Sequence, residues 1–230
     1  EDDLAVRAAR LLKAESGTRL GCDIALSKVI PVGGGMGGGS SDAAAVLVGL
    51  NELWGLGLDE ARLAELGLSL GADVPLFVRG FSAFAEGVGE KLSPVSLGDT
   101  WYLVVTPHSR VATGEVFRHP ALTRNSAPLK IDRFTRDMVD GATRVLDFAA
   151  LWRATRNDCE AVVRGISPPV DAAFRWLGAY AEARLTGTGA SVFAPFPSGA
   201  EAERVRERLP DEFRGIVARG VDRAVRRCAD

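Results

Sequence analysis

The feature that most constrains this chain is a dense run of glycine close to its N-terminal end. Six of the seven residues from Gly33 to Gly39 are glycine, out of 26 glycines in all 230 residues. The preceding residues 24–30 show the partial alternation of a strand, and residues 43–54 have the apolar pattern of a helix that ends near Gly55. The order predicts a strand, a glycine-rich loop and a helix.

A loop of this kind is suited to binding an anion. Glycine lets backbone N–H groups approach a ligand without a Cβ clash, and a helix N-terminus adds unpaired donors and the positive end of the helix dipole. We expect Ser40 or Ser41 to be the helix N-cap, with Asp42 in the first turn. The alternative is a flexible linker or a tight turn, but linkers rarely lead straight into so apolar a helix. The pattern favours a di- or triphosphate ligand.

Two well-known phosphate loops fit poorly. A Walker loop ends in Gly-Lys-Ser/Thr, and no lysine lies between Lys28 and Lys91. The dinucleotide fingerprint is met by Gly33, Gly35 and Gly38, but any such glycine run meets it. That fingerprint also needs an acidic residue at the end of a second strand about twenty positions on, which the pattern does not provide. A nucleotide-dependent dehydrogenase therefore stays as the weaker alternative.

Composition narrows the class of partner. The net charge is −2 and the arginines are spread along the chain, so we expect no nucleic-acid partner. No apolar run approaches the roughly 18–20 residues of a membrane span, so we expect no membrane partner. Cys22, Cys159 and Cys228 are too few and too scattered for a disulfide framework or a zinc site. Reduced thiols in a cytoplasmic protein are the expectation.

The glycine run is one of several motifs that resemble the GHMP kinases, such as galactokinase, homoserine kinase and mevalonate kinase. Five separated motifs in the family's order are far more specific than one loop; they are Pro31 to Ala44, Gly71 to Phe77, Phe84 to Glu90, Asn157 to Glu160, and Leu185 to Ser191. The motifs are most similar to the branch that phosphorylates a cytidine diphosphate-linked polyol in isoprenoid precursor biosynthesis. A homoserine- or mevalonate-type kinase, or an ATP-binding protein without turnover, remains an alternative.

The resemblance implies an α+β, two-domain GHMP kinase fold. Residues 1–98 would form the ATP-binding N-terminal domain, a ribosomal-protein-S5-like α/β unit, and residues 99–230 a ferredoxin-like α+β sandwich. We place the boundary near residue 98 because the composition changes there.

Periodicity predicts most elements within these domains. The expected helices are 4–12, 59–70, 131–139, 143–154, 157–164, one after Pro168-Pro169, and 199–209. The expected strands are 77–78, 81–85, 91–95, 101–105, 192–196 and 215–218. Residues 106–128 are expected to be loop-rich with one short helix.

By the same resemblance, ATP and Mg²⁺ would bind at the glycine run. The residues expected at the nucleotide are Lys28, Pro31, Val32, Gly33, Gly34, Gly35, Met36, Gly37, Gly38, Gly39, Ser40 and Ser41. The magnesium ion would bridge the β- and γ-phosphates, with Ser40 or Ser41 as ligands.

Asp73 is the expected catalytic residue. Pro75 biases Val74 toward an extended conformation, which would fix Asp73 at a helix-to-strand junction. On the residues alone, a turn or capping aspartate is the favoured interpretation. The resemblance reverses this, because in the family the aspartate of this motif orients and deprotonates the acceptor hydroxyl.

The substrate contacts are likewise implied by the resemblance. Phe117 would stack on the cytosine ring, although the residue pattern alone favours a helix residue that pins the loop to the core. Thr113 would line the same pocket, and Gly187, Thr188 and Gly189 would form a second loop that supports the phosphate loop.

Family members also carry an N-terminal Pro-Ala-Lys-Leu/Ile-Asn motif, whose lysine partners the catalytic aspartate, and a Gly-Tyr-His motif that contacts cytosine. Neither occurs in this sequence. We expect the natural protein to carry some tens of residues ahead of Glu1, and to work on a small-molecule substrate as a monomer or homodimer.

Overall fold

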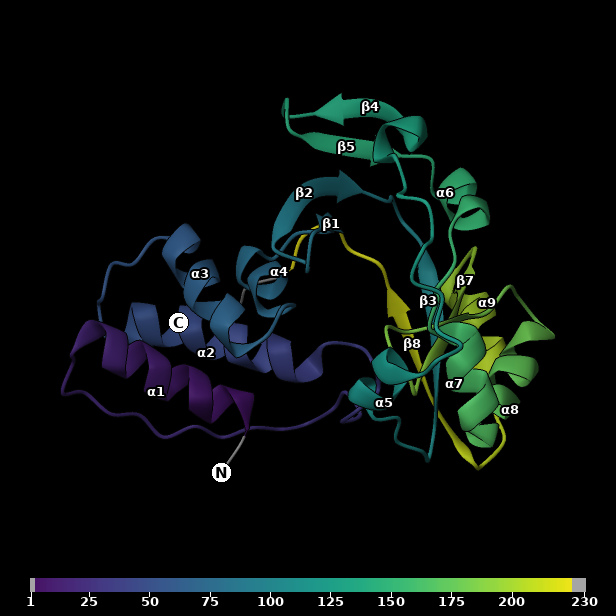
Figure 1. Cartoon of the computed structure of the whole chain (residues 1–230), viewed down its shortest axis with the longest axis horizontal. Coiled ribbons are helices and arrows are strands. Elements are labelled where there is room, and N and C mark those ends of the chain that lie inside the picture. The colour runs from purple at the N-terminus through teal and green to yellow at the C-terminus, as the bar shows by residue number, and fades with distance from the viewer. Residues whose placement is uncertain (1–2, 225–230) are drawn as a thin grey trace.

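The computed structural model describes residues 3–224, and its elements gather into a helical region, a first sheet and a helix-covered second sheet (Figure 1). The helical region contains α1 (Leu4–Ser16), α2 (Gly38–Leu53), α3 (Glu60–Leu70) and α4 (Val74–Arg79). Leu12, Leu47 and Val74 are fully buried where these helices meet. As predicted, α3 starts after Asp59, whose carboxylate accepts a hydrogen bond from the N–H of Arg62, and it stops at Gly71.

The first sheet joins residues from both sides of the expected domain boundary. Its strand order is β1-β2-β5-β4, with β1 (Ala83–Glu86), β2 (Lys91–Ser96), β4 (Thr135–Val139) and β5 (Thr143–Leu146). Its two hairpins are antiparallel, and β2 runs parallel to β5 with Val95 opposite Arg144. The boundary near residue 98 stays a prediction, and this pairing crosses it.

The second sheet has the strand order β6-β7-β3-β8 and is antiparallel throughout. Its strands are β3 (Trp101–Pro107), β6 (Arg184–Leu185), β7 (Val192–Phe196) and β8 (Phe213–Arg219). The helices α8 (Pro168–Gly178) and α9 (Gly199–Arg206) pack on it. The chain order β3-α8-β6-β7-α9-β8 with this strand order is the ferredoxin-like arrangement, which confirms the expected α+β sandwich.

The remaining elements lie between β3 and α8. They are α5 (Thr113–Arg118), the 3₁₀ helix η1 (Ile131–Phe134), α6 (Phe148–Ala154) and α7 (Glu160–Ile166). The short helix expected within residues 106–128 is therefore confirmed as α5. Buried side chains from α5, α7 and α8 join the core of the second sheet, among them Val116, Val163 and Leu177.

Helix was the wrong prediction for residues 135–139 and 143–146, which form the strands of the β4–β5 hairpin. The turn is Asp140-Gly141, with φ of 55° and 66°. The N–H of Ala142 donates to the carbonyl of Val139, so Asp140 and Gly141 are the central residues of a β-turn within the three-residue loop 140–142. Positive φ at both residues fits the type I′ turn that Asp-Gly favours. The dipeptide was the signal for a hairpin.

The strand predicted at residues 77–78 is also wrong, because those residues belong to α4. Pro75 lies in the first turn of this helix, where its missing N–H breaks no helical hydrogen bond. Pro75 therefore starts a helix here instead of preventing one, and Asp73 is the residue at its N-cap position.

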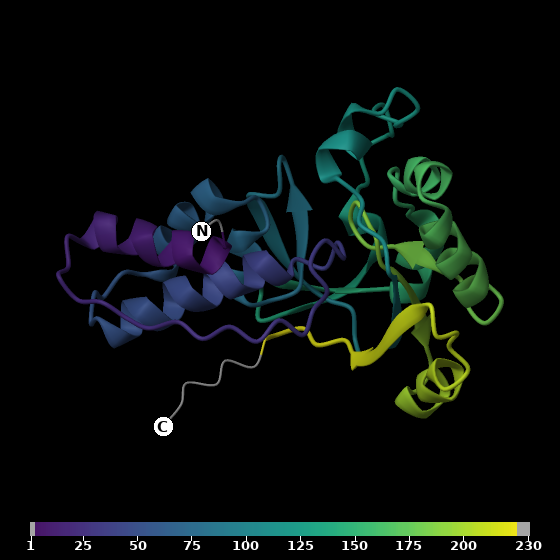
Figure 2. The same cartoon turned by 90° about the horizontal axis from the view of Figure 1, so that it is seen from below.

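Residues 24–30 do not form the predicted strand. They belong to a segment, residues 18–32, that we call the strap, which runs back from the end of α1 to the start of α2 (Figure 2). No strand of residues 3–224 pairs with it, so it lacks the ladder hydrogen bonds that define a strand. The indole N–H of Trp54 donates to the carbonyl of Gly21, 3.3 Å away, and holds one point of the strap against α2.

Cys22 is exposed and Cys159 is half-buried, and both are free thiols; Cys228 lies outside the described residues. Among the helices described, none has the length and apolar character needed to cross a bilayer.

Two leucines of α2 give a matched test of the core. Leu47 is fully buried, whereas Leu53 on the same helix is 68% exposed. Leu47→Ala is expected to lower the free energy of unfolding by about 2–5 kcal/mol, because it opens a cavity between α2 and its neighbours. Leu53→Ala should stay within about 0.5 kcal/mol of the wild type in the same chemical denaturation experiment. Equal losses in the two variants would contradict this packing.

Candidate active site

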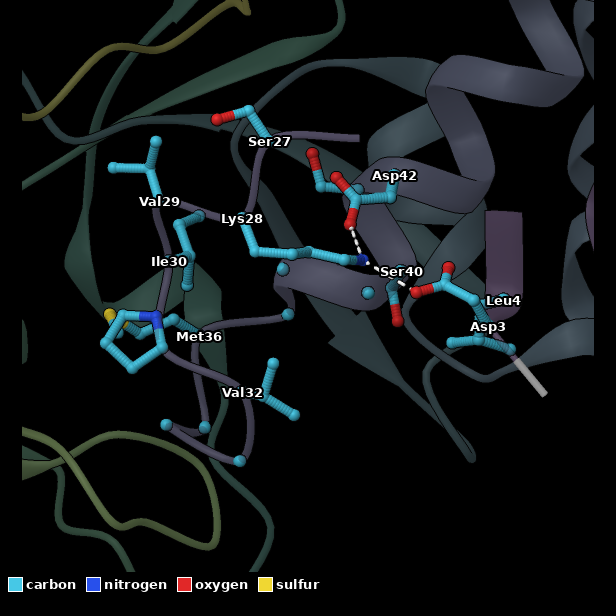
Figure 3. Close-up of a pocket in the computed structure, with 18 of the residues that line it drawn as sticks. Asp3, Leu4, Ser27, Lys28, Val29, Ile30, Val32, Met36, Ser40 and Asp42 are labelled. Atoms are coloured by element: carbon cyan, nitrogen blue, oxygen red, sulfur yellow. Dashed lines mark hydrogen bonds and ion pairs between the residues drawn. The ribbon is translucent and has the colours of Figure 1, made fainter. Parts of the chain in front are cut away.

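A cleft of about 660 Å³ lies over the glycine run (Figure 3). The strap, the glycine run and the first turns of α2 form its wall, and α5 contributes Thr113. All residues expected at the nucleotide line it, namely Lys28, Pro31, Val32, the glycines and methionine of 33–39, Ser40 and Ser41. The structure therefore brings the whole predicted set to one cleft.

The start of α2 differs from the prediction. The N-cap is Gly37, with φ of 68° and no side-chain cap, so the predicted N-cap role of Ser40 or Ser41 is wrong. The backbone at residue 37 is left-handed, and a Cβ there would lie 2.8 Å from the ring of Phe77, so a serine does not fit. Asp42 likewise lies beyond the first turn.

This glycine cap has a chemical consequence. A helix leaves its first N–H groups without partners inside the helix, and a Ser, Thr or Asp cap would satisfy one of them. Within the described residues, no side chain caps α2, whose first turn, residues 38–40, faces the cleft. The helix therefore presents open donors and its positive dipole end to whatever occupies the cleft.

A second glycine-rich loop, residues 186–191, docks against the first. Its backbone N–H groups donate to the first loop, from Ala190 to the carbonyl of Gly33 at 3.0 Å and from Ser191 to that of Gly34 at 3.3 Å. The hydroxyl of Thr186 donates to the same Gly34 carbonyl at 2.7 Å. These contacts fix the conformation of the first loop through two of its carbonyl oxygens.

The docking leaves no room for a side chain at Gly35. Its φ is 70°, and a Cβ there would lie 2.3 Å from the carbonyl oxygen of Thr186 and 2.7 Å from that of Gly189. At Gly33, with φ of 78°, a Cβ would meet nothing within 4 Å. Close contact between two backbones, not only backbone freedom, therefore requires glycine at position 35.

The second loop is itself held by side chains. The amide of Asn157 donates to the carbonyls of Gly187 and Leu185, at 2.6 and 3.0 Å, and its oxygen accepts from the N–H of Cys159. The hydroxyls of Thr188 and Thr113 are hydrogen-bonded at 2.9 Å. The sequence motif around Asn157 indicated that this segment matters, but it did not predict that Asn157 holds the second loop or that Thr186 bonds to the first.

Lys28 forms ion pairs with Asp42 and with Asp3, the latter at 3.0 Å (Figure 3). Hydrogen bonds to Asp42 and then Asp3 raise the pKa of the Lys28 ammonium. The N–H of Ala5 and then Lys28 lower the pKa of Asp3. The two carboxylates were not predicted, because an ion pair between the strap and two helices leaves no local sequence pattern.

Asp73 lies at the N-cap position of α4 and is exposed, and its carboxylate forms no hydrogen bond or ion pair with another residue of 3–224. It is not among the cleft-lining residues. Its neighbours nevertheless lie against the start of α2, since a Cβ on Gly71 would be 3.9 Å from the hydroxyl of Ser40, and the Phe77 ring packs under Gly37.

Phe117 is 56% exposed on α5, whereas Val116 beside it is fully buried. Val116 is therefore the residue that pins this segment to the core, and the ring of Phe117 is available to a ligand. Phe117, Gly187, Thr188 and Gly189 do not line the cleft, although Thr188 contacts Thr113, which does.

Two sequence comparisons bear on this site. The family description "GHMP kinases N terminal domain" matches residues 3–81, and "GHMP kinases C terminal" matches residues 142–215. A 4-diphosphocytidyl-2-C-methyl-D-erythritol kinase of Halorhodospira halophila is 51% identical over 227 residues, which cover 97% of this chain and 73% of that protein. An enzyme of the same name from Pseudomonas putida is 53% identical over 96% of this chain and 71% of its own length.

Comparison with solved structures identifies the same family. A crystal structure of 4-(cytidine 5'-diphospho)-2C-methyl-D-erythritol kinase matches with a TM-score of 0.76 and 32% identity, covering 94% of this chain and 77% of that one. Methanococcus jannaschii mevalonate kinase shares the fold alone, with a TM-score of 0.64 and 14% identity over 94% of this chain and 74% of its own. The chain therefore belongs to the GHMP kinase family, among its 4-diphosphocytidyl-2-C-methyl-D-erythritol kinases.

Proposed function

We propose that this chain transfers the γ-phosphoryl group of ATP to the 2-hydroxyl of 4-diphosphocytidyl-2-C-methyl-D-erythritol, in the methylerythritol phosphate pathway to isoprenoid precursors. The observation that carries the proposal is the open N-terminus of α2 in a cleft formed by the motif-bearing loop of this family. Relatives of that name at 51–53% identity support the choice of acceptor. The homoserine and mevalonate kinases, at 16% and 14% identity, support only the fold.

The first loop and α2 would hold the ATP phosphates. The carbonyls of Gly33 and Gly34 accept hydrogen bonds from the second loop, so they are already occupied when a phosphate would bind. The N–H groups of residues 38–40 remain for the phosphate oxygens, where the helix dipole also favours negative charge. Phosphoryl transfer relies mostly on positioning and charge stabilisation, which such a preorganised site provides.

A magnesium ion fits the cleft, because serine hydroxyls there can act as ligands. Residues 3–224 contain no cluster of three His, Cys, Asp or Glu side chains suited to a metal ion, so its other ligands would be phosphate oxygens. Ser40 and Ser41 lie in the first turns of α2 and line the cleft, and neither hydroxyl is used as a cap. Bound magnesium would neutralise charge on the β- and γ-phosphates.

Asp73 would accept the proton of the acceptor hydroxyl as the new P–O bond forms. Its carboxylate has no competing partner in the described residues, and its segment packs against the start of α2, which would hold the phosphates. A proton acceptor at hydrogen-bond range is sufficient for this role.

Acceptor recognition would fall to α5 and the second loop. Phe117 offers an exposed ring for the cytosine, and Thr113 connects α5 to Thr188 at the cleft. Gly187, Thr188 and Gly189 would support the phosphate loop and line the acceptor side. We place the enzyme in the cytoplasm, as a monomer or homodimer.

Acceptor profiling tests the function. The full-length protein is expected to release ADP from ATP and magnesium with 4-diphosphocytidyl-2-C-methyl-D-erythritol, and not with homoserine, mevalonate or galactose. Turnover with one of the other alcohols would keep the kinase and overturn the acceptor. Absence of turnover with every alcohol, despite ATP binding, would favour a binding protein.

Asp73→Asn separates chemistry from nucleotide binding. It removes the proton acceptor without changing side-chain size, so kcat is expected to fall about 10²–10⁴-fold while the KM for ATP stays within about twofold. Asp211→Asn, at an exposed aspartate between α9 and β8, is the matched control and should be neutral. A kcat for Asp73→Asn equal to that of the control would rule out the assignment.

Phe117→Ala tests cytosine stacking. Loss of the ring should weaken acceptor binding by about 1–3 kcal/mol, because that is the range for a base on an aromatic side chain. Phe117→Tyr keeps the ring and should retain the KM for the acceptor, and neither variant should change the KM for ATP. An acceptor KM that is unaltered in Phe117→Ala would argue against this contact.

A further inference from the structure

A second cleft, of about 500 Å³, shares part of its lining with the nucleotide cleft. One wall is the strap, residues 28–32, with Gly34, and the other is the end of β3 and its following turn, residues 106–110, with Arg214 of β8. Both clefts therefore share the strap and Gly34. The proposed function does not use the second wall.

The second wall is basic. His108, Arg110 and Arg214 are exposed and line the cleft, and no aspartate or glutamate lines it. None of the three forms an ion pair with another residue of 3–224, although the described part of the chain contains many arginine–carboxylate pairs elsewhere. The two unpaired arginines, which are cations, focus a positive potential along this concave wall, and such a potential attracts anions.

Backbone geometry brings the two arginines and His108 together. In the β3–β8 ladder Arg214 is the partner of Thr106. Thr106 lies two positions before His108 in the chain, so Arg214 is close to the turn. The N–H of Ser109 donates to the carbonyl of Pro107 at 2.7 Å, and its hydroxyl contacts that of Ser167 at 3.2 Å. The backbone and the side chain of Ser109 therefore both hold the turn that carries His108 and Arg110.

The strap supplies a different wall. The Lys28 side chain points toward Asp42 and the nucleotide cleft, while Val29 projects from the other side of the strap (Figure 3). The side chains of Val29 and Val32 are 74% and 67% exposed. Apart from Lys28, whose ammonium is paired with Asp3 and Asp42, the strap therefore adds apolar surface and no carboxylate to the second cleft.

The floor between the clefts is rigid. Thr106 is buried, and its hydroxyl is hydrogen-bonded to that of Ser191 at 2.8 Å. Ser191 in turn donates its N–H to the carbonyl of Gly34. The second cleft is therefore built on the same hydrogen-bonded support as the phosphate loop, but His108, Arg110 and Arg214 line the second cleft alone.

We propose that the second cleft is an anion-binding site, distinct from the nucleotide cleft, for the diphosphate group of a small phosphorylated compound. Guanidinium groups bind phosphate oxygens in bidentate geometry, and two of them with an imidazole match a multiply charged phosphate better than a single carboxylate. The ligand touches the strap that also lines the nucleotide cleft. It does not replace ATP.

Inorganic pyrophosphate is the probe, titrated calorimetrically into the full-length protein with an excess of a non-hydrolysable ATP analogue. We expect pyrophosphate to bind beside the analogue. The Arg110→Gln/Arg214→Gln variant should bind it at least about tenfold more weakly, because two charge-assisted contacts are lost. The matched control Arg204→Gln/Arg208→Gln, which removes two exposed arginines at α9, should stay within about twofold of the wild type.

Three results would overturn the proposal. The first is pyrophosphate binding that is unchanged in Arg110→Gln/Arg214→Gln. The second is an equal loss in the control variant, which would indicate general surface charge. The third is displacement of pyrophosphate by the ATP analogue, with weaker binding of the analogue itself to Arg110→Gln/Arg214→Gln, which would make the cleft part of the nucleotide site. Because the readout is binding, failure of the proposed kinase reaction would leave this test unaffected.

Discussion

The site depends on the hydrogen bonds that lock two glycine-rich loops together. Gly33 and Gly34 accept from Ala190, Ser191 and Thr186, so the first loop is held through its carbonyl oxygens while the start of α2 faces the cleft. A flexible glycine loop would lose much conformational entropy on binding a phosphate. Docking on the second loop means that this ordering is completed during folding, which preorganises the site for its ligand.

The ferredoxin-like domain therefore supports the proposed nucleotide site, although it lies outside the helical region. Its β6–β7 connection carries the second loop, and Asn157, ahead of α7, fixes that loop through the carbonyls of Gly187 and Leu185. The α2 helix then begins at a glycine, because only glycine fits both the left-handed backbone and the Phe77 ring of α4. In an ordinary helix an uncapped start leaves N–H groups unpaired and lowers stability, whereas at an anion site the same N–H groups can bind the ligand.

Much of this was predictable from sequence, for identifiable reasons. The glycine run, the Asp59 cap, the proline-led α8 and the ferredoxin-like domain follow from local chemistry or from ordered motifs. The β4–β5 hairpin and α4 were predicted wrongly although each has a local signal, the Asp140-Gly141 dipeptide and the proline in the first helical turn. The strap lacked a strand partner, and the Gly37 cap was decided by Phe77, forty residues away. Contacts of that kind, like the Lys28 ion pairs, are tertiary and have no local pattern.

The most direct test of the account compares two glycines of the same loop. Gly33→Ala and Gly35→Ala both place alanine at a positive φ, which costs about 1–2 kcal/mol. At Gly35 alone the new Cβ meets the carbonyl of Thr186, at 2.3 Å, and drives the two loops apart. If their docking creates the phosphate site, the dissociation constant for ATP should rise at least about tenfold more in Gly35→Ala than in Gly33→Ala. Equal ATP affinity in the two variants would contradict the account.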